Sequence, residues 1–405
     1  MASSVSAPRR VPVATNGIVL IHADFLITGI VMTFIGPMLP ILAARWSLTD
    51  AQSGSLIFVQ FFSSMFGMLA SGISVQRLGY RTTLIIGSLL MASGTALLAS
   101  GPWGMGIVAV CILGIGYGIT TPAGNLRTAE INPDRSASAL NVINAIWGIG
   151  AMSSPFLVAI AQREHHPAYF LYGTASALLL LLLALLLSRF VPDTHAHSET
   201  AVADSSLWND GVLPLICALF FIYVGTETSF GAWVATYARR IDSRAHTFAT
   251  MTPAFYWGAL LLGRALAPII LRFRSAVAIA RGGLAVALLG GGALVAAHGI
   301  KLVVLGAILA GLGLASIFPI SVSLLPGWFG PSARRASGAV FASGNIGGAV
   351  VPWFMGEVST HAAGLRLAFL VPLLGVSAML AFYLTNKAAA AARRRQVNAP
   401  DLLLN

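Results

Sequence analysis

Long apolar segments separated by short polar loops run along almost the whole chain. A helix of about 20 apolar residues crosses the ~30 Å hydrocarbon core of a bilayer, and twelve segments satisfy this test. With 57% hydrophobic and only 9% charged residues, the chain cannot cover the surface of a soluble protein. The sequence therefore predicts an all-α integral membrane protein with twelve transmembrane helices. We place these helices at residues 17–44, 52–75, 82–100, 104–128, 136–162, 168–190, 211–238, 247–271, 276–298, 300–325, 337–360 and 365–386.

The longest polar segment, residues 191–210, divides the spans into two sets of six. We predict an N-terminal six-helix bundle at 1–190, a cytoplasmic linker at 191–210, and a C-terminal bundle with a basic tail at 211–405. Most Lys and Arg residues lie in loops on the side that carries both termini, which predicts cytoplasmic termini in the inner (plasma) membrane. This placement indicates a partner bilayer and not nucleic acid. A basic group at 239–244 lies on the opposite side and breaks the rule.

The two predicted bundles share a series of small-residue landmarks. A shift of 197 residues brings residues 112–155 of the first half onto the second half without a gap. An ordered series in corresponding spans indicates a duplicated six-helix unit, and two parallel repeats of six helices are the plan of the major facilitator superfamily. The coinciding residues are Gly114 with Gly311, Gly116 with Gly313, Pro122 with Pro319, Gly150 with Gly347, and Pro155 with Pro352.

One loop carries a second likeness to that superfamily. The stretch "GISVQRLGYR" at residues 72–81 resembles the loop between helices 2 and 3, G-x-x-x-D-R-x-G-R-R. The resemblance implies a cytoplasmic latch between the halves in which the Asp takes part. Because Gln76 stands at the Asp position and carries no charge, an ionic latch is in question here. The matching residues are Gly72, Arg77, Gly79 and Arg81.

Within the superfamily, "GYGITTPAGNL", "ALNVINAIWGIGA" and the stretch from "FPISVSLL" to "GGAVVPWFMG" resemble the fucose-permease-like sugar:proton symporters. The resemblance implies sugar transport by alternating access. Asp24 matches the helix-1 acid of that branch, and Asn125 and Asn141 match its amides. Thr121 replaces the helix-4 Glu, so the resemblance leaves uniport or a different coupling acid open.

Only two carboxylates, Asp24 and Glu227, fall well within predicted spans. A charge at the bilayer centre costs at least ~2.5–3.5 kcal/mol, so such residues usually face a partner or a wet cavity. We predict that both acids couple protons to transport. The alternative for Glu227 is a structural bond to Tyr256 or Arg264. For Arg264, we favour a side chain that reaches the cytoplasmic surface over one that anchors an anion or a carboxylate.

Amides beside aromatic rings suit a sugar, since amides bond hydroxyl groups and rings stack on C–H faces. Asn141, Asn144 and Trp147 follow at intervals of three on one predicted helix, and Trp233 and Tyr237 are four apart on another, so each set shares a face. The alternative for each residue is interhelical hydrogen bonding or plain packing. The predicted substrate-binding residues are Gln60, Asn125, Asn141, Asn144, Trp147, Trp233, Tyr237, Tyr256 and Asn345.

The chain carries no motif of a soluble enzyme and no metal-ligand spacing, so we expect no catalysis, cofactor or metal. We predict a monomeric secondary transporter of a small polar solute, a monosaccharide, coupled to protons as a symporter. Three alternatives remain: a sugar uniporter, a proton-coupled exporter of amphipathic compounds, and a sensor on a transporter fold that moves no solute.

Overall fold

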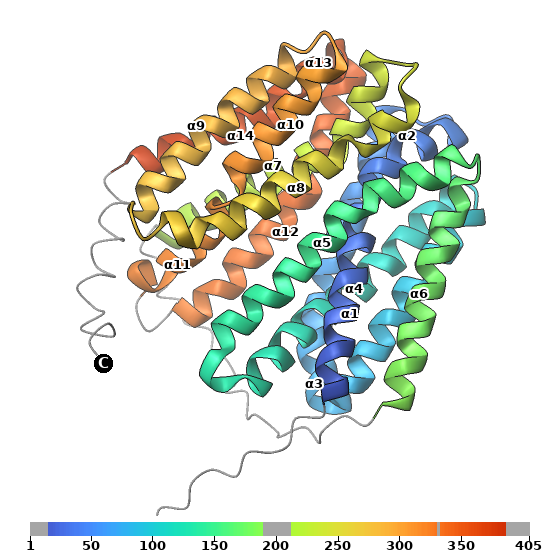
Figure 1. Ribbon diagram of the computed structural model, residues 1–405, viewed down its shortest axis with the longest axis vertical. Coiled ribbons are helices and arrows are strands. Elements are labelled where there is room, and N and C mark those ends of the chain that lie inside the picture. Colours follow the sequence, from blue (N-terminus) through green and yellow to red (C-terminus); the bar gives the residue numbers. More distant parts are fainter. Residues whose placement is uncertain (1–14, 189–211, 330–332, 386–405) are drawn as a thin grey trace, which may run out of the picture.

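The computed structural model describes residues 15–188, 212–329 and 333–385, and within them every regular element is helical (Figure 1). The bounds agree with the predicted spans to within a few residues. The predicted linker at 191–210 and the basic C-terminal tail lie outside the described residues. The main helices are α1 Thr15–Thr33, α2 Ile35–Trp46, α3 Asp50–Ser100, α4 Trp103–Ile131, α5 Ser136–Arg163, α6 Pro167–Leu187, α7 Val212–Ile241, α8 His246–Ile270, α9 Ala276–Val295, α10 Ile300–Leu314, α11 Ile317–Phe329, α12 Ala333–Val358, α13 Leu365–Ala368 and α14 Leu370–Leu384.

Helix α3 holds two membrane spans. It has 51 residues, which at 1.5 Å per residue is ~77 Å, more than twice the ~30 Å core of a bilayer. Gly79 interrupts it with φ 79° and ψ 167°, a conformation that only glycine adopts without strain. With α3 counted as two spans and the bent pair α1–α2 as one, the described residues contain the twelve predicted spans.

The first span is bent by 43° between α1 and α2. Pro37 is the cause, because it has no N–H to donate to the carbonyl of Thr33 and its ring crowds that carbonyl. The bend falls at mid-span, where Met32, Thr33 and Gly36 line a cavity described below.

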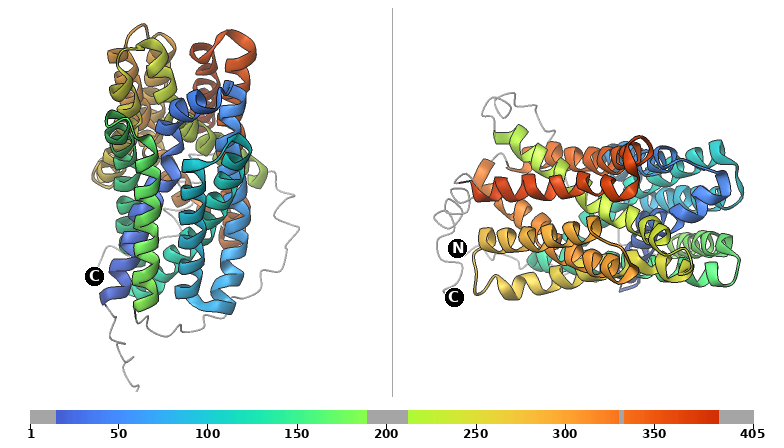
Figure 2. Two further views of the ribbon diagram at one scale, coloured as in Figure 1. Left: turned by 90° about the vertical axis from the view of Figure 1, so that its right-hand side faces the viewer. Right: turned by 90° about the horizontal axis from the view of Figure 1, so that it is seen from above.

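The spans form two six-helix bundles side by side, one coloured blue to green and one yellow to red in Figures 1 and 2. Glycines predicted to correspond have the same role in each bundle. A Cβ on Gly150 of α5 would collide with the backbone oxygen of Leu26 in the first helix of its bundle. A Cβ on Gly347 of α12 would likewise collide with the backbone oxygen of Phe221 in α7, the first helix of the second bundle. The pseudo-symmetry expected from the repeat is therefore present in the packing.

This packing gives a direct test. Gly150→Ala would place a methyl group inside the α1–α5 contact, and overpacking of this kind costs about 1–3 kcal/mol. We expect a lower thermal unfolding temperature in detergent. Gly173→Ala on α6 is the matched control, because a Cβ there meets no atom within 4 Å. Equal melting temperatures for the two variants would contradict the close contact.

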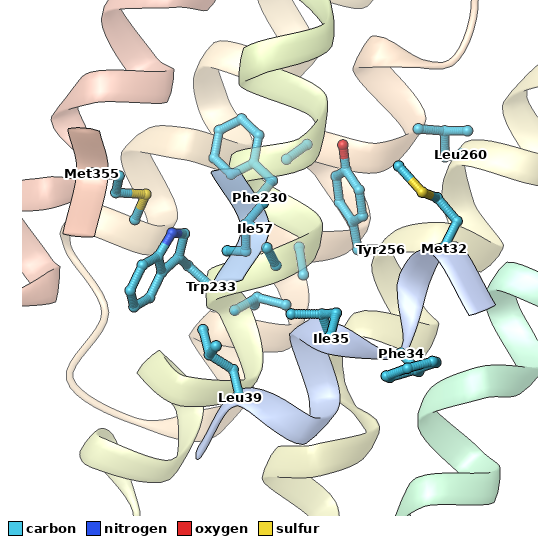
Figure 3. Close-up of a cluster of buried hydrophobic side chains, with 14 of the residues drawn as sticks. Met32, Phe34, Ile35, Leu39, Ile57, Phe230, Trp233, Tyr256, Leu260 and Met355 are labelled. Atoms are coloured by element: carbon cyan, nitrogen blue, oxygen red, sulfur yellow. The ribbon is translucent and has the colours of Figure 1, made fainter. Parts of the chain in front are cut away.

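The bundles meet mainly along three helix pairs, α2 with α7, α3 with α12, and α5 with α8, and α2 also contacts α8. Figure 3 shows the dry core of this interface, where Ile35, Leu39 and Ile57 from the first bundle lie near Phe230 and Met355 from the second. These buried side chains join the two bundles, and Ile35 and Ile57 also line the cavity described below.

One end of the interface carries polar contacts between the bundles. Arg240 at the end of α7 binds both carboxylate oxygens of Asp50 at the start of α3, with N···O distances of 2.7 and 2.5 Å. The Ser359 hydroxyl also donates to Asp50, and the backbone N–H of Ala51 donates to Thr360 Oγ1 at 2.9 Å. We call these five residues the end clamp.

Two other basic residues at this end cap helices. Arg45 donates to the backbone oxygens of Ala99 at 2.8 Å and Gly101 at 3.1 Å, at the C-terminus of α3. Arg366 donates to the oxygen of Ala297, just beyond α9, at 2.6 Å. A cation is stabilised at a helix C-terminus by the carbonyl dipoles. Capping and the end clamp therefore give structural roles to Arg45, Arg240 and Arg366, which the predicted topology places on the outer side.

Candidate functional site

A cavity of about 250 Å³ lies between the two bundles near mid-depth. Its walls come from α1, α2, α3, α4 and α5 on one side and from α7, α8, α11 and α12 on the other. Both aromatic rings and polar groups line it. The rings include Phe61, Tyr117, Trp147, Trp257 and Phe318, and the polar groups include Gln60, Thr121, Asn144, Glu227, Arg264 and Asn345.

The charged group in the cavity is an ion pair. Arg264 Nη2 of α8 donates to Glu227 Oε1 of α7 at 2.7 Å, and the Tyr223 hydroxyl donates to the same oxygen at 2.8 Å. The Tyr256 hydroxyl donates to the backbone oxygen of Glu227 at 2.9 Å. The other carboxylate oxygen, Oε2, has no hydrogen-bond partner within the described part of the chain. Glu227 therefore keeps one acceptor free while its charge is balanced.

These contacts correct one expectation and select among others. We favoured an Arg264 side chain that reaches the cytoplasmic surface, and this is wrong, because the guanidinium faces the cavity and pairs with Glu227. Of the two structural partners considered for Glu227, Arg264 binds its carboxylate, whereas Tyr256 binds its backbone.

Asp24 lies apart from this group. It is fully buried in α1, and neither carboxylate oxygen has a hydrogen-bond partner among the described residues. It does not line the cavity, although its neighbour Phe25 does. The two intramembrane acids therefore do not share one chamber.

Three of the five predicted amides line the cavity: Gln60, Asn144 and Asn345. Their N–H groups bind backbone oxygens, as in Asn144 Nδ2 to Leu140 at 2.7 Å, which leaves their carbonyl oxygens as acceptors. Asn125 and Asn141 are not part of the lining. Asn125 Nδ2 bonds back to the oxygen of Thr121 at 3.0 Å within α4, and Asn141 is exposed one turn before Asn144.

Of the predicted aromatic contacts, only Trp147 lines the cavity. Its ring meets that of Trp257 edge to face across the α5–α8 contact, with centroids 6.1 Å apart. Trp233, Tyr237 and Tyr256 are buried elsewhere and use their polar atoms on backbone oxygens. Trp233 donates to Pro352 at 2.9 Å and Tyr237 to Leu294 at 2.8 Å, so both hold helices together.

The sequence reasoning missed several residues of the lining, notably Tyr117, Thr228 and Phe318. Tyr117 and Thr121 lie one turn apart in the quoted "GYGITTP" stretch, so helical spacing from Thr121 was the available signal. Trp257 follows Tyr256 directly on α8, and the two rings meet edge to face with centroids 5.2 Å apart, but only Trp257 lines the cavity.

The loop motif forms the turn inside α3. Beyond Gly79, Arg81 Nε donates to the backbone oxygen of Leu185 at 2.8 Å, and its Nη2 donates to Leu186, so it caps the end of α6. Gln76 and Arg77 are exposed, and Gln76 makes no hydrogen bond with the described residues. The loop motif therefore forms the turn of α3 through Gly79 and caps α6 through Arg81.

A family model, the Major Facilitator Superfamily, matches residues 25–298. The chain belongs to the major facilitator superfamily. It is therefore a multi-pass membrane transporter and not an enzyme.

Curated relatives and solved structures agree with this membership. The chain is 25% identical to a glucose/galactose transporter of Brucella abortus over 389 residues, covering 89% of this chain and 91% of the relative. A crystal structure of a D-xylose-proton symporter matches with a TM-score of 0.73 at 14% identity, covering 91% of this chain and 97% of the other. The Escherichia coli fucose:proton symporter matches with a TM-score of 0.61 at 19% identity, with the same two coverages of 91% and 97%.

Proposed function

We propose that this transporter carries a monosaccharide through the central cavity. One observation supports this above all: the free Oε2 of Glu227 and the amide oxygens of Asn144 and Asn345 share a small cavity with the rings of Trp147 and Trp257. Acceptors placed beside flat apolar rings match a ligand with hydroxyl groups on its edge and C–H groups on its faces. The similarity to the glucose/galactose transporter of Brucella abortus supports the same solute class.

Transport in this proposal proceeds by alternating access between the bundles at residues 1–190 and 211–405, joined by the linker at 191–210. The end clamp and the dry core seal the cavity from one side. We place both termini in the cytoplasm and the protein in the inner (plasma) membrane, so the cavity of this state faces the cytoplasm.

Proton coupling is assigned to Asp24 and Glu227. A buried carboxylate without a partner is costly, so ionisation of Asp24 requires water or a new donor to reach it. Separation of packed helices would admit either one, which links the proton on Asp24 to the conformational change.

A second candidate is proton-independent uniport, favoured by the ion pair that already balances Glu227 and by Thr121 in place of the helix-4 acid. The two mechanisms differ in one measurement. A symporter in liposomes accumulates sugar above the outside concentration only when an inward proton gradient is imposed, whereas a uniporter never exceeds it.

Two amides on α5 offer a matched test of the sugar site. Asn144→Ala removes an acceptor from the cavity wall, whereas Asn141→Ala removes the same group one turn away, outside the lining. A hydrogen bond contributes about 0.5–1.5 kcal/mol, so the half-saturating sugar concentration should rise about twofold to tenfold for Asn144→Ala and stay unchanged for Asn141→Ala. Uptake from a panel of labelled monosaccharides into liposomes measures both.

Two outcomes of these uptake measurements would contradict the proposal. If no sugar enters but the liposomes move an amphipathic dye, the protein is an exporter. If both Asn variants weaken uptake equally, the site is not the described cavity.

A further inference from the structure

A second pocket lies on the outer face of the C-terminal bundle, and its lining differs in chemistry from that of the sugar cavity. It is a groove of about 510 Å³ between α8 and α9, with α10 behind it. Helix α10 packs closely on both neighbours, while α8 and α9 diverge from one another. Three glycines of the lining, Gly263, Gly283 and Gly313, lie where α8 and α9 pack closely on α10 and its C-terminal end.

The groove is lined by apolar side chains that face the membrane. Leu266, Ile270 and Leu312 are 39%, 43% and 38% exposed, and Ala278 and Val286 complete the walls. No carboxylate belongs to this lining. A narrow apolar channel open to the bilayer matches the shape and chemistry of a hydrocarbon chain.

One end of the groove carries a free positive charge. Arg274, in the turn between α8 and α9, lines the groove and is exposed. Its guanidinium forms no hydrogen bond or ion pair with the described residues. The turn follows the end of α8 at Ile270, so Arg274 lies at the depth of lipid headgroups. A guanidinium binds phosphate oxygens in pairs, which is favourable at this position.

We propose that this groove is a specific site for one anionic phospholipid, with an acyl chain between α8 and α9 and the phosphate on Arg274. The apolar walls select a lipid over a soluble phosphate ester. The unpaired guanidinium selects an anionic headgroup over a zwitterionic one, because the phosphate of a zwitterionic lipid is already balanced by its own cation.

The site has a direct connection to transport. Gly263 lines the groove where α8 packs on α10, and the next residue, Arg264, lines the sugar cavity and binds Glu227. A chain packed against Gly263 would hold this turn of α8 in place.

The test uses purified protein in detergent, with unfolding temperature followed during titration of three probes. These are dioleoyl phosphatidylglycerol, dioleoyl phosphatidylcholine and glycerol phosphate. A basic residue near a membrane surface contributes about 1 kcal/mol toward an anionic lipid, so Arg274→Gln should raise the phosphatidylglycerol concentration for half-maximal stabilisation about fivefold. Arg272→Gln is the matched control, two residues earlier in the same turn and outside the lining.

Ala278→Trp fills the groove without changing charge and should abolish the preference for phosphatidylglycerol. If that variant does not fold, Ala278→Leu takes its place. The proposal is overturned if phosphatidylcholine stabilises the protein as strongly, if glycerol phosphate alone reproduces the effect, or if the two Arg variants respond alike. These readouts contain no sugar, so they are independent of the proposed transport function.

Discussion

Glu227→Gln should abolish gradient-driven sugar uptake and lower the unfolding temperature together. The substitution leaves the Arg264 guanidinium, 29% exposed, without its 2.7 Å partner. Removing one member of a buried ion pair costs about 3–5 kcal/mol, and access of water to this cavity puts the expected loss near the lower end of that range. Arg264→Gln should have a similar effect on stability, because it leaves the carboxylate unbalanced.

The double variant Glu227→Gln/Arg264→Gln separates structure from transport. Two neutral amide side chains leave no unbalanced charge, so stability should recover most of the loss seen in each single variant. Uptake should stay at background, because the free carboxylate oxygen is gone. If the double variant accumulates sugar under a proton gradient, the pair is structural and Glu227 has no part in coupling. Thermal unfolding in detergent and uptake into liposomes provide the two readouts.

Loss of the end clamp should shift the conformational equilibrium toward opening at that end. Arg240→Ala removes two charge-assisted hydrogen bonds to Asp50, which is 9% exposed. Hydrogen bonds to charged groups contribute about 1.5–3 kcal/mol each, but the Arg240 side chain is 48% exposed, so we expect a total of about 1–2 kcal/mol. The population open at this end should rise about fivefold to thirtyfold.

Cysteine labelling measures that shift. In a variant without Cys111 and Cys217, a cysteine in place of Asn144 reports on the cavity. A membrane-impermeant thiol reagent added outside cells should label it faster when Arg240→Ala is present. Arg239→Ala is the neighbouring control. Equal labelling with and without Arg240→Ala would show that the clamp does not keep this end closed.

A charge exchange completes the test. Asp50→Arg with Arg240→Asp should restore slow labelling if the attraction between the two charges matters, even though the Ser359 contact is lost. If the exchange labels as fast as Arg240→Ala, the geometry around Asp50 is responsible and not the charge pair.

The fold could be predicted because the signal for a membrane helix is its length and apolar content, which are local properties. The break at Gly79 was also visible, since the loop motif "RLGYR" falls inside the long helix. The repeat could be recognised in the sequence because close helix contacts leave no room for a larger side chain, as at Gly150 and Gly347.

The site was predictable only in part, because spacing assigns residues to a helix face and not to the neighbour that the face meets. Trp233 and Tyr237 share a face, but that face is packed inside the C-terminal bundle. Asn144 and Trp147 share a face of α5 that lines the cavity. The prediction that Arg264 reaches the surface was wrong because it used only the distance of Arg264 from the end of its own helix. The partner of Arg264 is Glu227, which lies on another helix.

The single-residue turn at Gly79 has a consequence for how the molecule moves. The two spans of α3 follow one another with no slack between them, and both pack against α4. Neither span can slide along its axis without moving the other in the same direction. We therefore expect the hairpin to tilt as one body when the cavity is sealed or unsealed, so that a movement at Asp50 is transmitted to the turn at Gly79.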